Sequence, residues 1–123
     1  MGRYGCTTTC IADLSTYFGD NDDPAEVAHR IQYSTGLVIW GSCKFRYFHF
    51  ERREFGRNDA NIKAALKDPN RAVILQVQNG SHWVVAIGTA LLGGYRIADP
   101  WFGDFSTTKR YGNSITGAAY FRK

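Results

Sequence analysis

The chain of 123 residues contains only three cysteines, Cys6, Cys10 and Cys43, and no two of them form a CxxC pair. This spacing argues against a disulfide framework and against a structural zinc site. The sequence also lacks a run of about 18 apolar residues that would predict a membrane span. It shows no leader in which basic, apolar and small residues follow one another. We therefore predict no metal and no other cofactor, and the localisation stays open.

The chain also has only a small excess of one charge: charged residues make up 21% of it, and the formal net charge is +4. The one basic cluster is FERREFGR at 50–57. A basic balance favours nucleic acid, anionic membranes or cell-wall polymers as partners. So small an excess fits ordinary solubility better, and nucleic-acid binding is disfavoured. The 44% of hydrophobic residues can form a core, and the length suits a single domain, 1–123.

The N-terminal half carries helical signals. Residues 7–18 repeat apolar side chains at helical spacing, and 19–33 combine acidic residues with an early proline. Residues 58–70 predict a further helix, with Asn58 or Asp59 as its N-cap. The aromatic-rich stretch between Thr35 and Gly56 has no clear assignment.

The C-terminal half changes to strand signals. Short β-branched or aromatic runs are separated by turn residues, and they occupy 72–78, 82–88, 94–99 and 117–123. Helices first and strands afterwards predict an α+β fold, in which N-terminal helices pack on a C-terminal antiparallel sheet.

Three residues of this arrangement could form a catalytic group. If 82–88 and 94–99 form a hairpin with its turn near residues 90–91, His82 lies opposite Asp99. Cys6 stands at the expected start of the first helix, where the helix dipole and an imidazolium would both favour the thiolate. A carboxylate behind the imidazole would orient the ring. The pattern therefore predicts a Cys6, His82, Asp99 triad.

Each of these residues also has a structural interpretation. A lone cysteine is more often a small buried hydrophobe than a nucleophile, and ADP can simply end a strand. The order of Cys at a helix start, His at a strand start and Asp at the next strand end is what favours the triad. Cys10 is interpreted as a packed core thiol.

The blocks YGCTTTCIADLSTYFG (4–19), SHWVVAIG (81–88) and YRIADPWFGD (95–104) resemble, in this order, the papain-like double-glycine leader peptidases that process bacteriocin precursors, and their stand-alone relatives. The resemblance implies a papain-like cysteine peptidase fold. It also implies that Cys6 is the nucleophile, and that His82 and Asp99 complete the triad.

Two departures from that family bear on activity. Its cysteine is usually followed by Gly-Pro, whereas Cys6 is followed by three threonines. Relatives place a glutamine upstream of the cysteine, and none of the five residues before Cys6 is glutamine. Losing one oxyanion donor typically costs about 10²–10³ in rate. We expect that the chain lacks an N-terminal segment of its domain.

Two functions remain open at this point. The first is a cysteine hydrolase that cleaves a peptide or amide bond, in a protein leader or a peptidoglycan-like substrate, through an acyl-enzyme. The second is a catalytically silent papain-like module that binds peptide within a larger phage or bacterial protein. The oligomeric state stays open.

Overall fold

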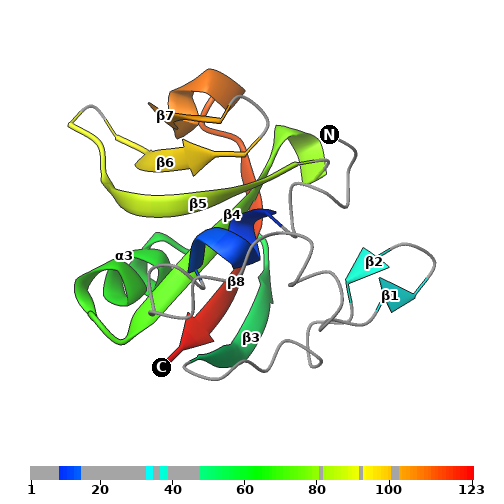
Figure 1. Ribbon diagram of the computed structural model, residues 1–123. Coiled ribbons are helices and arrows are strands. Elements are labelled where there is room, and N and C mark those ends of the chain that lie inside the picture. Colours follow the sequence, from blue (N-terminus) through cyan, green and yellow to red (C-terminus); the bar gives the residue numbers. More distant parts are fainter. Residues whose placement is uncertain are drawn as a thin grey trace.

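The computed structural model describes residues 9–14, 33–34, 37–38, 48–80, 82–91, 93–100 and 103–123. Their main feature is a six-stranded sheet in the order β3-β8-β4-β5-β6-β7, with every neighbouring pair antiparallel. The strands are β3 (His49–Phe55), β4 (Arg71–Val77), β5 (His82–Thr89), β6 (Tyr95–Asp99), β7 (Asp104–Thr107) and β8 (Ile115–Arg122). The sheet is strongly twisted, as Figure 1 shows for β6 against β3 and β8.

The remaining described elements are short. They are a helical segment at 9–14, the helix α3 (Asp59–Lys67), the 3₁₀ turns η2 (Gln78–Gly80) and η3 (Thr108–Tyr111), and a separate pair of two-residue strands, β1 (Tyr33–Ser34) and β2 (Leu37–Val38).

The predicted fold class is wrong. The described residues are mostly antiparallel sheet with two short α-helices, and not the α+β papain-like arrangement of N-terminal helices on a C-terminal sheet. One reason is the stretch that resisted assignment, because residues 49–55 form the edge strand β3 and pair with β8. Charged side chains on this edge hide the apolar alternation of a strand. The other reason is that α3 lies between β3 and β4 in the chain, so the helices do not precede the sheet.

Several local predictions are confirmed. The helix α3 has Asn58 as its N-cap, and the Asn58 side chain accepts a hydrogen bond from the backbone N–H of Asn61. The strands β4, β5, β6 and β8 cover the four predicted β runs within one or two residues. The predicted helix over 19–33 lies outside the described residues except for Tyr33, which belongs to β1.

The two faces of the sheet carry two separate apolar cores. On one face, Ile62 and Ala65 of α3 pack on buried side chains that include Val77 and Val84. On the other face, the helical segment 9–14 packs on buried side chains that include Ile74, Trp83, Val85 and Phe121. The segment 9–14 and α3 therefore cover opposite faces, and each side chain of the sheet points to one face or the other.

Candidate functional site

The structure brings His82 and Asp99 together at one end of the sheet. The imidazole Nε2 lies 2.8 Å from Asp99 Oδ1, and the two residues are 4% and 2% exposed. A carboxylate can only accept, so Nε2 carries the proton and Nδ1 is the nitrogen that would have to meet a thiolate. The predicted contact between these two side chains is confirmed.

The hairpin register differs from the predicted one by two residues. Val85 pairs with Ala98, two positions further along β6 than expected, and a bulge follows between Ala86 and Gly88. On the His82 side of that bulge, an even displacement leaves the side chains on their original face. His82 consequently reaches Asp99 along a diagonal of the strand pair, which is still within reach of long side chains.

Asp99 is held from its other side by the turn η3. Its Oδ2 accepts hydrogen bonds from the Tyr111 hydroxyl and from Arg110, at 3.1 Å for the guanidinium. The Tyr111 ring also packs beside the imidazole, with 5.4 Å between the ring centres. Both carboxylate oxygens are therefore engaged, and Oδ1 is oriented toward His82.

Two groups around Asp99 have shifted pKa values. Burial, and then the hydrogen bond to Asp99, raise the pKa of Tyr111 well above its usual range, so it stays a neutral donor. Arg110 also makes two 2.9 Å contacts to Asp104, and this pairing lowers the pKa of Asp104. Asp104 thereby fixes the guanidinium that contacts Asp99.

Tyr111, Arg110 and the connection to Asp104 were not among the predicted site residues. No motif marks them, although the hairpin of β6 and β7 pairs Asp99 with Asp104 directly. The only sequence signal was Gly112, because glycine favours the left-handed conformation that ends a helical turn. In the structure Gly112 ends η3 with a φ of 65°. That turn returns the chain toward the end of β6.

Cys6 lies outside the described residues, and its membership in the triad stays a prediction. The segment 9–14 that follows it packs on the face with Trp83 and Val85. His82 lies on the other face, because it pairs with Val77, which packs under α3.

Cys10 is confirmed as a packed core thiol. It is 0% exposed, and its Sγ donates to the Trp83 carbonyl oxygen at 3.4 Å. Trp83 belongs to the same core. Cys43, His29 and Trp101 lie outside the described residues.

Gln76 is committed to the sheet and to its turn. Its amide nitrogen donates to the Gly80 carbonyl at 3.1 Å, and its oxygen accepts from Arg53 at 3.0 Å and Thr116 at 3.1 Å. Gln76 is therefore not placed to serve as an oxyanion donor, and Gln78 follows it in η2 with a φ of 53°.

Among the residues that the structure describes, no three His, Cys, Asp or Glu side chains are grouped so that they could hold a metal ion. Over the same part of the chain, none of the helices has the length and apolar character needed to cross a membrane. The chain matches no protein-family model and shows no significant similarity to a curated protein.

Proposed function

We propose that this protein is a cysteine hydrolase that cleaves a peptide or amide bond, with Cys6 as nucleophile, His82 as general acid and base, and Asp99 as the orienting carboxylate. The observation that carries the proposal is the buried 2.8 Å contact between His82 Nε2 and Asp99 Oδ1, with Tyr111 and Arg110 on the remaining oxygen. The resemblance of the three sequence blocks to double-glycine leader peptidases supports it.

The chemistry follows from these roles. The Cys6 thiolate attacks the carbonyl carbon, and His82 donates a proton to the departing amine. This leaves a thioester between the acyl group and Cys6. A water molecule then gives its proton to His82, attacks the thioester and releases the acid, which restores the Cys6 thiolate and the protonated His82. Asp99 stabilises the imidazolium in both steps.

The substrate class follows less directly. A peptide leader or a peptidoglycan-like cross-link both contain the amide bond that this chemistry requires. The small basic excess of the chain mildly favours an anionic cell-wall polymer. We propose no nucleic-acid partner.

The decisive experiment measures the alkylation of Cys6 by iodoacetamide, peptide by peptide, with mass spectrometry between pH 5 and pH 8. A thiol paired with an imidazole has a pKa lowered from about 8.5 to roughly 3.5–7.5, so Cys6 should react quickly at pH 6. Replacing the imidazole in His82→Gln should return Cys6 to the slow rate of an ordinary thiol. Cys10 is the internal control, because it is 0% exposed and should stay unlabelled.

A second function is favoured by two observations. His82 is only 4% exposed, and the segment 9–14 packs on the opposite face of the sheet from His82. Both fit a catalytically silent module that binds peptide, in which the His82 and Asp99 pair is structural. Equal alkylation of Cys6 in the native protein and in His82→Gln would reject the hydrolase and support this module.

A further inference from the structure

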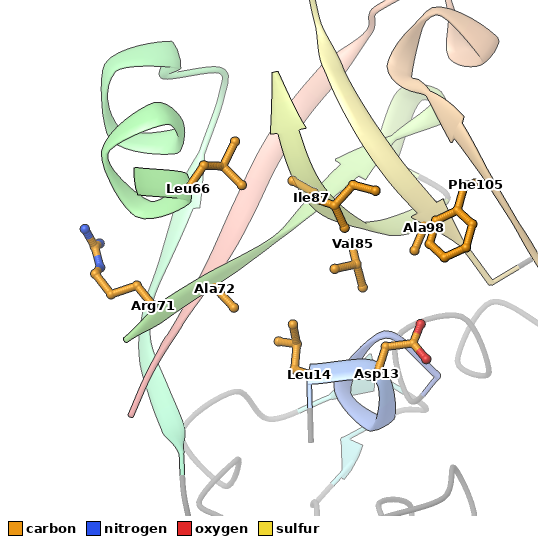
Figure 2. A pocket seen from close by; sticks show the side chains of 10 residues that line it. Asp13, Leu14, Leu66, Arg71, Ala72, Val85, Ile87, Ala98 and Phe105 are labelled. Atoms are coloured by element: carbon orange, nitrogen blue, oxygen red, sulfur yellow. The ribbon is translucent and has the colours of Figure 1, made fainter. Parts of the chain in front are cut away.

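A pocket of about 390 Å³ lies between the segment 9–14 and the sheet, and it reaches Ala86 and Leu66 on the α3 side. Its size lies near the lower end of the range for small-molecule sites, about 300–1,000 Å³. Figure 2 shows its apolar wall, to which the segment 9–14, α3 and the strands β4 to β6 contribute Leu14, Leu66, Ala72, Val85, Ile87 and Ala98. Only two of the ten lining residues, Asp13 and Arg71, carry a charge.

The two charged residues differ in what they offer a ligand. Arg71 is already paired with Glu51, and its guanidinium makes contacts of 2.6 Å and 3.1 Å to Glu51 Oε1. Asp13 has no hydrogen-bond or ion-pair partner among the described residues. Although Asp13 is exposed on its outer side, burial raises the pKa of its carboxyl, as expected for a carboxylate that borders apolar surface.

An aromatic ring lies at the same end of the pocket. Figure 2 shows the Asp13 carboxylate pointing toward the end that contains Ala98 and the Phe105 ring. Phe105 is 78% exposed on the edge strand β7, so one face of its ring is accessible. Asp13 and Phe105 both line this pocket. A carboxylate and an aromatic face that line one pocket can attract an organic cation through both charge and the ring quadrupole.

We propose that this pocket binds a small organic ammonium with an apolar body, of the alkylamine or arylalkylamine class. The ammonium group lies between the Asp13 carboxylate and the Phe105 ring. The apolar body extends along Leu14 and Val85 toward Leu66. An anionic ligand with its charge at the Arg71 end of the pocket is disfavoured, because Arg71 is the only cationic residue of the lining and Glu51 already neutralises it.

The site is separate from the proposed catalytic residues. Neither His82 nor Asp99 lines the pocket. His82 lies on the α3 side of the sheet, whereas Leu14, Ala72 and Val85 pack on the face that carries the segment 9–14. The inference therefore does not depend on the hydrolase. Failure of either one leaves the other standing.

Isothermal titration calorimetry of the whole chain with 4-phenylbutylamine tests the proposal, with 4-phenylbutan-1-ol and 4-phenylbutyrate as neutral and anionic counterparts. We expect the amine to bind about tenfold more tightly than the alcohol, which is the contribution expected from one charge-assisted hydrogen bond. Asp13→Asn should abolish that preference and leave alcohol binding unchanged. Phe105→Leu should weaken the amine about two- to fivefold.

Two further variants serve as controls. Asp68→Asn makes the same change at the turn after α3, outside the pocket, and should preserve the preference for the amine. Ala98→Leu fills the pocket and should weaken the amine and the alcohol alike. Equal binding of amine and alcohol, tighter binding of the butyrate, no binding of any probe, or an unchanged preference in Asp13→Asn would each overturn the proposal.

Discussion

Tyr111→Phe removes one hydroxyl and leaves the ring that packs beside His82. In the native structure this hydroxyl donates to Asp99 Oδ2, and Arg110 donates to the same oxygen at 3.1 Å. The Asp99 side chain is 0% exposed, so its charge depends on these donors for compensation. The substitution therefore removes one donor from a buried carboxylate and changes little else.

The expected cost follows from this geometry. A hydrogen bond to a charged group contributes about 1.5–3 kcal/mol, and leaving a buried acceptor short of a donor adds to the loss. Two features reduce the figure here, because Arg110 stays in place and Tyr111 is only partly buried, so water can reach part of the gap. We expect the free energy of unfolding to fall by about 1–2 kcal/mol.

Urea denaturation at pH 7 measures this loss, and the alkylation rate of Cys6 gives a second readout. Tyr120→Phe is the matched control, because the Tyr120 hydroxyl donates to Glu54 at 3.0 Å, far along the chain from His82. Both variants should lose stability, whereas only Tyr111→Phe should slow alkylation at pH 6. Two results would refute this prediction: a urea midpoint for Tyr111→Phe equal to that of the native protein, or an equal slowing of alkylation in both variants.

Three further predictions concern stability. Burial, and then a hydrogen bond to a carboxylate, raise the pKa of Tyr95 above its ordinary value near 10. The contribution of the Tyr95 hydroxyl to the free energy of unfolding is therefore complete below pH 10 and is lost as the pH rises beyond it. In urea titrations, the difference in stability between the native protein and Tyr95→Phe should narrow above pH 10, and a constant difference would contradict this. Ile74 is 0% exposed and Ile87 is 43% exposed, so Ile74→Ala should cost about 2–5 kcal/mol and Ile87→Ala well under half of that by the same measurement. Gly94 and Gly93 both have a left-handed φ, but only at Gly94 would a methyl group collide with polar side chains, so thermal unfolding should show a clearly larger loss for Gly94→Ala than for Gly93→Ala.

The local structure of this protein is largely encoded in short stretches of sequence. Asn58 caps α3 because its side chain meets an amide three residues later, and that spacing can be read directly. The runs that became β4, β5 and β6 are short, rich in apolar and β-branched or aromatic residues, and bounded by turn residues, which together favour strands. The contact between His82 and Asp99 also followed from this level, because a hairpin joins the start of one strand to the end of the next.

Tertiary structure decided what local patterns could not. The strand β3 is an edge strand rich in charge, so only its pairing with β8, more than sixty residues later, makes it a strand. The register of β5 and β6 was set by where the turn lies and by the bulge between Ala86 and Gly88, neither of which the sequence located. Arg110 and Tyr111 reach Asp99 because η3 folds back on the end of β6. Long-range pairing contributes energy that no short window of sequence contains, and it therefore fixed the fold class and completed the surroundings of Asp99.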